Sequence, residues 1–141
     1  MTQEQKDLLL KDLCARLPYG VKVAFLNEDL THHSEPKTLI RIECINNLNY
    51  SRLEDEDGNT TIAEFVKPYL LPISSMTEEQ RDEYDKMSEL DIEYSITQIK
   101  NDSLIWTSGL NRYNWFIKNN FDVYDLIPMG LAIDATGLNI Y

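Results

Sequence analysis

The opening residues of the chain alternate polar and apolar positions with the period of an α-helix. Thr2-Gln3-Glu4-Gln5 forms a capping box, in which Thr2 and Gln5 satisfy each other's backbone N–H groups. Pro18 ends the helical pattern, and Gly20 permits the turn that follows. The pattern predicts a helix over residues 3–16. Five apolar residues share one face of this helix: Leu9, Leu10, Leu13, Cys14 and Leu17.

Period-two patterns follow and predict strands at 21–26, 38–45 and 48–54. A turn at Asn46-Asn47 joins the last two as an antiparallel pair. In the first strand one side carries Val21, Val23 and Phe25, and in the second one side carries Ile40, Ile42 and Cys44.

The stretch TTIAEFVKPYLLPISS, residues 60–75, is more apolar but less regular. Pro68 and Pro72 argue against a central strand and against a long helix. We therefore expect a short strand followed by packed irregular chain. Further on, DIEYSITQI (91–99) returns to period two and predicts another strand through Ile92, Tyr94 and Ile96.

Two more helices are predicted, over 78–88 and 104–119. Thr77-Glu78-Glu79-Gln80 repeats the N-terminal capping box in front of the first of them. That helix has only Tyr84 and Met87 as apolar anchors, so we expect it to be peripheral. Asn119-Asn120 can end the other helix, whose apolar stripe contains Trp106, Leu110, Tyr113 and Ile117.

Trp115 lies on the opposite side of the third helix from this stripe. Either the apolar tail that follows covers it, through Leu126, Ile127 or Met129, or it is an exposed anchor for a partner protein. We favour coverage, because large exposed aromatic side chains are uncommon outside interfaces.

Together these elements predict a single α+β domain over residues 1–141. It would contain three helices and a small, mainly antiparallel sheet of about four strands. A doubly wound parallel sheet is disfavoured, because no helix separates the strands at 21–26, 38–45 and 48–54.

The composition adds one unusual property, a formal net charge of −11 in 141 residues. The negative electrostatic field of a chain with this charge repels phosphates, so we expect neither direct nucleic-acid binding nor binding to a membrane. The N-terminus has no signal-peptide pattern, and no apolar run reaches the roughly 20 residues of a membrane span. We therefore expect a cytoplasmic protein in which Cys14 and Cys44 are reduced and buried.

The patterns that could hold a metal or a cofactor fail in specific ways. Asp55, Asp57 and Glu64 match three positions of a calcium loop, but Leu53 stands where the first carboxylate belongs. His32-His33 are adjacent and have no ligand at zinc spacing near them. The five glycines form no phosphate or dinucleotide loop. We predict no catalytic residue, no metal site and no cofactor.

One acidic stripe, Glu78, Asp82, Asp85 and Glu89, recurs at helical spacing along the second helix. Charge runs are usually solvated faces. A carboxylate row can also imitate the phosphates of DNA and block an enzyme that binds DNA.

Three segments resemble an uncharacterised family of small proteins from gut bacteria of the Bacteroides type and from their phages and prophages. The segments are LPYGVKV (17–23), VKPYLLPISSMTEEQ (66–80) and NWFIKNNFDVYDLIPMGLAID (114–134). Family members often carry His where Asn120 stands, so the resemblance implies no catalytic histidine there. It implies an origin in a mobile element and no activity.

The same segments could line a groove, with Tyr19, Tyr69 and Tyr124 as its walls and Trp115 beside them. We expect a non-enzymatic accessory or protein-interaction protein whose partner is a host or phage protein. The alternatives are a hydrolase or transferase whose carboxylates meet only in the fold, and an acidic inhibitor that imitates DNA.

Overall fold

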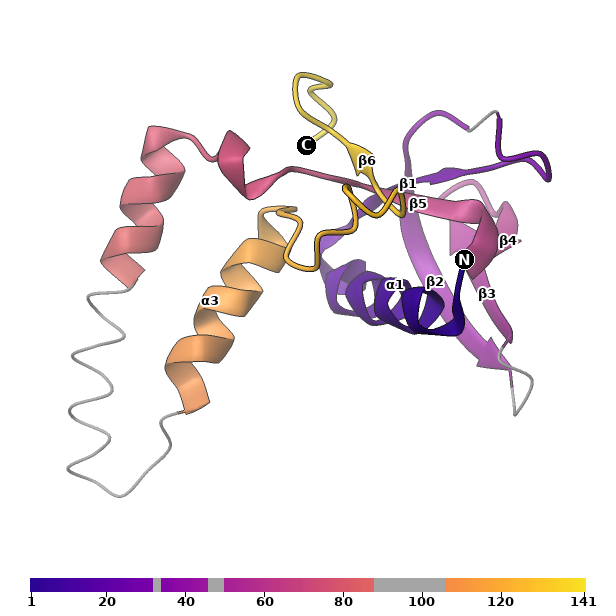
Figure 1. The fold of residues 1–141 in the computed structure, drawn as a ribbon, viewed down its shortest axis with the longest axis horizontal. Coiled ribbons are helices and arrows are strands. Elements are labelled where there is room, and N and C mark those ends of the chain that lie inside the picture. Colours follow the sequence, from indigo (N-terminus) through magenta and orange to yellow (C-terminus); the bar gives the residue numbers. More distant parts are fainter. Residues whose placement is uncertain (32–33, 46–49, 88–105) are drawn as a thin grey trace.

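A six-stranded sheet in the order β4-β3-β2-β1-β5-β6 organises the protein, which is described here as a computed structural model (Figure 1). The structure describes residues 1–31, 34–45, 50–87 and 106–141, and for 106–111 the backbone alone. The strands are β1 (Lys22–Phe25), β2 (Lys37–Ile45), β3 (Tyr50–Asp55), β4 (Thr60–Ile62), β5 (Val66–Leu70) and β6 (Ile133–Asp134). The helices are α1 (Gln3–Arg16), an unlabelled helix over residues 78–87, α3 (Trp106–Lys118) and the short 3-10 turns η1 (Leu17–Tyr19), η2 (Ala63–Phe65) and η3 (Ile73–Ser75).

The predicted α+β class is therefore confirmed, with six strands instead of about four. α1 has the predicted bounds, and Thr2 and Gln5 form the predicted capping box. Gly20 adopts the left-handed conformation (φ 73°) that turns the chain from η1 into β1. The predicted strand at 91–99 lies outside the described residues.

All neighbouring strands are antiparallel except β5 and β6, which run parallel. The side-chain alternation predicted for β2 was wrong at its start. A register shift between Leu39 and Arg41 breaks the period of two, so Leu39 is buried while Ile40 is 51% exposed. Such a bulge adds one residue to a strand and turns every later side chain to the other face.

A short strand was expected here and is present, but the prediction that Pro68 excludes a central strand was wrong. β5 contains Pro68 and has β1 on one side and β6 on the other. Leu26 N–H donates to Phe65 O (2.8 Å), so Leu26 and Phe65 form a hydrogen-bonded pair. Hydrogen-bonded and non-hydrogen-bonded pairs alternate along an antiparallel ladder. Pro68, which lies opposite Val23, therefore falls in a pair that exchanges no hydrogen bonds. On the other side β6 begins only opposite Tyr69, so no strand requires the missing N–H.

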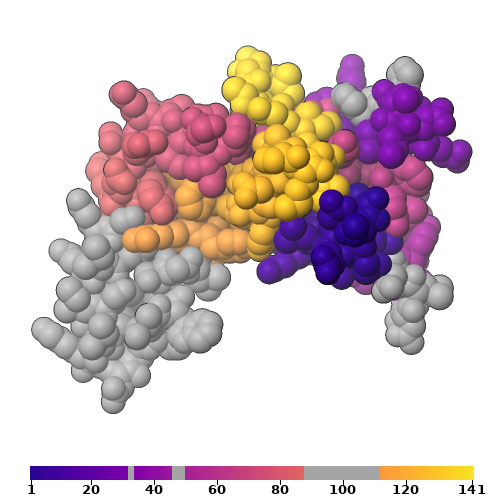
Figure 2. Space-filling model, viewed as in Figure 1, coloured from indigo at the N-terminus to yellow at the C-terminus, as the bar shows by residue number. Residues whose placement is uncertain are grey.

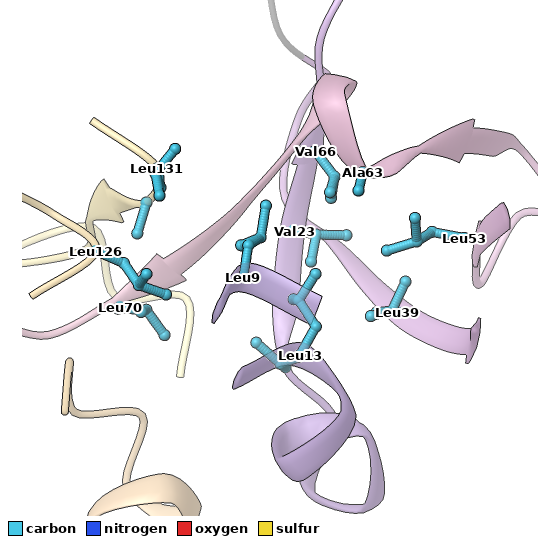
Figure 3. Packing of buried hydrophobic residues seen from close by; sticks show 12 residues of the cluster. Leu9, Leu13, Val23, Leu39, Leu53, Ala63, Val66, Leu70, Leu126 and Leu131 are labelled. Carbon is cyan, nitrogen blue, oxygen red and sulfur yellow. The ribbon is translucent and has the colours of Figure 1, made fainter. Parts of the chain in front are cut away.

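The main core lies between α1 and one face of the sheet (Figure 3). Leu9 and Leu13 from α1 meet Val23, Leu39 and other strand residues there, together with Leu126 and Leu131 from the tail. A smaller cluster of Ala24, Tyr69 and Ala135 covers the opposite face. The sheet is thus apolar on both faces near β1 and β5.

The helix over residues 78–87 and α3 project together from one side of the sheet and form what we call the arm (Figure 1). α3 ends in a Schellman motif, with hydrogen bonds from Phe121 N–H to Phe116 O (3.0 Å) and from Asn120 N–H to Ile117 O (3.1 Å). Asn120 has φ 64°, as its position after the third helix predicted. The chain after α3 then packs between the arm and α1 (Figure 2).

Candidate functional site

A buried ion pair in α1 connects this helix to the arm. Asp12 and Arg16 lie one turn apart and are both 0% exposed. Arg16 Nε donates to Asp12 Oδ2 (2.8 Å) and Arg16 Nη2 to Asp12 Oδ1 (2.9 Å), so the carboxylate is held at both oxygens. This bidentate geometry is the strong form of the arginine–carboxylate pair.

Arg16 also reaches the end of α3. Its Nη2 donates to Phe121 O (2.6 Å) and its Nη1 to Ile117 O (3.4 Å). Ile117 O and Phe121 O belong to the turn that ends α3, where the negative end of the helix dipole favours a cation. Arg16 therefore ties α1, α3 and the start of the tail together at one point.

Burial dominates the electrostatics of this pair. Desolvation raises the pKa of Asp12 above its ordinary value, although the hydrogen bonds and charge of Arg16 act in the opposite direction. The nearby carboxylate of Asp122 raises it further. A raised carboxyl pKa is a feature of many catalytic acids. Here, however, both carboxylate oxygens accept hydrogen bonds from Arg16, which makes Asp12 a structural acceptor.

A pair of tyrosines lies next to the ion pair. Tyr113 and Tyr124 share a hydrogen bond between their hydroxyls (3.1 Å), and their rings meet edge to face with centroids 6.3 Å apart. Lys11 Nζ lies 5.3 Å from the centre of the Tyr124 ring. Burial raises the pKa of Tyr113, and the hydrogen bond with Tyr124 adds to the effect. The Tyr113 hydroxyl is therefore not activated as a nucleophile.

Within the arm, an aromatic cluster surrounds Trp115, which is 7% exposed. Its ring stacks on Phe121 (centroids 5.7 Å, planes 21° apart) and contacts Tyr84 from the helix over residues 78–87 at 5.7 Å. Phe116 completes the cluster. The predicted burial of Trp115 is confirmed, and the apolar tail contributes to its cover through Phe121, but not through the three residues Leu126, Ile127 and Met129. Leu126 and Ile127 pack on the main core instead, and Met129 is exposed.

The Trp115 indole N–H is buried and has no acceptor among the described residues. Buried polar groups without a partner are few in folded proteins, and each costs free energy. The cluster is therefore not fully satisfied internally, in contrast to the Asp12–Arg16 pair.

The outer surface of the helix over residues 78–87 is acidic. Thr77 caps it as predicted, accepting from Gln80 N–H (3.2 Å) while Gln80 Oε1 accepts from Thr77 N–H (3.0 Å). All five acids within it are exposed: Glu78, Glu79, Asp82, Glu83 and Asp85. None of the salt bridges within the described residues uses these five, so their charge faces solvent.

The four residues predicted to bind a partner are not brought together in one groove. Tyr19 is exposed in η1, and Tyr69 is buried in the smaller cluster. Tyr124 packs on the main core, on the other face of the sheet from Tyr69. Trp115 lies in the arm. Strand alternation explains the separation, because Tyr69 and its neighbour Leu70 must point to opposite faces.

The two cysteines were predicted to be buried, and this was wrong, since both thiols are free and exposed. The buried face of α1 is formed by Leu9, Asp12, Leu13 and Arg16, so Cys14 lies outside it, on the side of the helix that periodicity had marked as apolar. Cys44 is the last residue but one of β2. Although the residue is exposed, partial desolvation of its thiol raises the pKa of Cys14, and the nearby Cys44 thiol contributes. The thiol is thus less reactive than an ordinary one.

The loop that resembles a calcium site uses its carboxylates internally. Asp55 Oδ1 accepts from the N–H groups of Asp57 (3.0 Å) and Asn59 (2.9 Å), which closes the turn at Gly58. Glu64 pairs with Lys6 at 2.6 Å, away from that turn. No group of three possible metal ligands occurs among the described residues, and His32 and His33 lie outside them.

Sequence reasoning missed the Asp12–Arg16 pair. The available signal was an acid and an arginine four residues apart, each next to the apolar face of Leu9 and Leu13. That spacing also describes an ordinary exposed ion pair, so only the packing of α3 identifies it as buried.

No known protein family, no curated protein and no solved structure matches this chain. In the described part of the chain, each helix is too short or too polar to cross a membrane.

Proposed function

We propose that this chain is a non-enzymatic accessory protein that acts in the cytoplasm by binding another protein through its arm. The observation that carries this proposal is the construction of the arm. Its inner side is anchored by Arg16 and by the Trp115 cluster, while its outer side presents five exposed acids. An anchored helix with a charged outer face suits recognition of a partner with a basic surface.

The enzymatic alternative has less support. Asp12 is the buried carboxylate whose raised pKa would suit acid–base chemistry, but Arg16 holds both of its oxygens. General acid–base catalysis requires a group within hydrogen-bond reach of the reacting proton. A substrate would have to displace Arg16 from a fully buried pair before it could reach Asp12.

An acidic inhibitor that imitates DNA is the second candidate, and the exposure of the acids favours it. Glu78, Asp82 and Asp85 follow one row along the helix, and Glu79 and Glu83 follow a second. Two rows of carboxylates could occupy a site built for phosphates. On this proposal the partner is a DNA-binding protein and competes with DNA for the arm.

The origin implied by the resemblance suggests where to search, namely in phage-infected cells of a Bacteroides-type host. The full chain is used as bait, with the partner identified by mass spectrometry. A charge-reversed arm (Glu79→Lys, Asp82→Lys, Glu83→Lys) should lose the partner. A matched control with the same charge change on the loop before β2 (Glu28→Lys, Asp29→Lys, Glu35→Lys) should retain it, because these acids are exposed elsewhere.

The outcomes separate the candidates. Loss of the partner with the arm variant alone supports the proposal, and competition by a DNA duplex would then identify the mimic. Equal loss with both variants would show only a general electrostatic attraction and would contradict a role for the arm. Recovery of no partner, together with turnover in a substrate screen, would reverse the ranking in favour of an enzyme.

A further inference from the structure

The edge of β5 that faces β1 has three different partners in succession. β1 pairs with it as far as Pro68, opposite Val23. At Tyr69 the partner is a side chain, because the Tyr141 hydroxyl donates to Tyr69 O (2.7 Å). At Leu71 the partner is the chain after α3, with hydrogen bonds to Asn120 O and from Asp122 N–H (both 2.8 Å).

The Tyr141 hydroxyl occupies the place of one rung in the β1–β5 ladder. Hydrogen-bonded pairs alternate along an antiparallel ladder. Leu26–Phe65 is such a pair (2.8 Å), so Ala24–Lys67 and then Lys22–Tyr69 are the next in that register. Lys22 N–H instead donates to the Tyr141 hydroxyl (3.0 Å), which passes the connection on to Tyr69 O.

Residues 135–141, which we call the strap, lie on the sheet face opposite α1 and stand out from the surface (Figure 2). On their inner side Ala135 and Ile140 pack against Ala24 and Tyr69. The outer side chains are half exposed, 49% at Leu138 and 48% for Tyr141 as a whole. The hydroxyl end of Tyr141 points inward to Lys22 N–H and Tyr69 O, and desolvation there raises its pKa to about 12 although the Lys22 N–H lowers it.

We propose that the strap is a releasable cover, and that its release is coupled to closure of the Lys22–Tyr69 rung. When Tyr141 leaves, Lys22 N–H and Tyr69 O can bond directly, as the register of the ladder requires. Neither group is then left buried without a partner, which removes the largest penalty for detaching a hydrogen-bonded side chain. Release uncovers Ala24 and Tyr69 on this face of the sheet.

This inference is independent of the proposed function of the arm, since it concerns a different surface. It predicts that, in the full chain, the smaller substitution at Tyr141 has the larger effect on hydrogen exchange of the Lys22 amide. Tyr141→Phe keeps a ring in the gap but removes the hydroxyl, so the Lys22 amide should exchange with solvent roughly tenfold faster than in the wild type. Tyr141→Ala empties the gap and lets the rung close, so the Lys22 amide should keep its wild-type exchange rate.

Amide hydrogen exchange measured by NMR tests this order residue by residue. The Leu26 amide, which bonds Phe65 O in the same ladder, is the internal reference and should be unchanged in both variants. Leu138→Ala, an exposed strap substitution away from the ladder, should leave the Lys22 amide unaffected. Fast exchange at Lys22 in Tyr141→Ala as well, or unchanged exchange in Tyr141→Phe, would overturn the proposal.

Discussion

α1 and the helix over residues 78–87 begin in the same way. In each a Thr-x-x-Gln capping box forms with nearly equal distances, 3.1 and 2.9 Å at Thr2–Gln5 against 3.2 and 3.0 Å at Thr77–Gln80. The local signal that starts both helices is therefore equivalent, and it operates within one turn of chain.

The two helices then differ in what they bury. α1 buries Leu9 and Leu13 in the main core and the whole Asp12–Arg16 pair beneath α3. The helix over residues 78–87 meets α3 through Tyr84 and keeps its five acids in solvent. A cap thus specifies where a helix begins, whereas the width of its apolar stripe specifies how deeply it packs.

The largest effect should come from breaking the buried pair of α1. Arg16→Ala leaves the Asp12 carboxylate buried without its partner and removes the hydrogen bonds to Ile117 O and Phe121 O. The free energy of unfolding should fall by about 3–5 kcal/mol, measured by urea denaturation. The double variant Asp12→Leu, Arg16→Met removes both charges together and should recover much of that loss, and a double variant as unstable as Arg16→Ala would contradict this explanation.

A somewhat smaller loss is expected in the arm. Trp115→Ala removes the ring that stacks on Phe121 and contacts Tyr84, which should cost about 3 kcal/mol. Thermal and urea melts should show this destabilisation, with the exposed neighbour Asn114→Ala as a control close to wild type. A Trp115→Ala variant that melts like the wild type would instead identify Trp115 as a residue that only a partner requires.

The two caps offer a matched pair of substitutions. Thr2→Ala and Thr77→Ala each remove the same hydrogen bond, worth about 1 kcal/mol. At Thr2 the loss should appear in global unfolding, because α1 is part of the main core. At Thr77 it should appear mainly as faster amide exchange within residues 78–87, with little change in the global transition. Equal global losses would show that both helices belong to one cooperative unit.

The smallest effect concerns the Lys6–Glu64 pair (2.6 Å), which fastens the start of α1 to η2. Burial alone would raise the pKa of Glu64, but the hydrogen bond and charge of Lys6 outweigh it and lower that pKa. Its contribution is therefore present above the ordinary carboxyl pKa and is lost as the pH falls through the lowered value. The loss should be less than about 1 kcal/mol.

Urea melts at neutral and acidic pH test this. Lys6→Met should be less stable than the wild type at neutral pH and equal to it in acid. A difference that persists in acid would assign the effect to the packing of the Lys6 side chain.

The sequence was informative wherever a local pattern decides the structure. The bounds of α1, the caps of both helices, the strands at β1 and β2 and the left-handed Asn120 all follow from residues within one or two turns of each other. The β2 bulge was missed, because the residue types along the strand do not show which residue is left out of the pairing with β3. Pro68 was misinterpreted, because the position of a proline in a ladder depends on the register of the neighbouring strand.

In the candidate site, too, local patterns were predictable and contacts between distant residues were not. The burial of Trp115 under the apolar tail could be predicted, but not which tail residue stacks on its ring, nor the contact with Tyr84. Tyr19, Tyr69 and Tyr124 were chosen from segments that resemble a family, and the fold places them in three different environments. The surroundings of a side chain depend on residues that are distant in sequence, so no local pattern contains them.

By itself, the sequence determined that this protein forms capped helices and short antiparallel strands with an acidic surface, since these properties depend on neighbouring residues and on composition. Only the tertiary structure decided that Arg16 joins α1 to α3, that the five acids lie on the outside of the arm, and that Tyr141 completes a rung between Lys22 and Tyr69. The physical reason is separation along the chain. Arg16 and Phe121, like Lys22 and Tyr141, are more than a hundred residues apart and meet only when the sheet and both helices have packed.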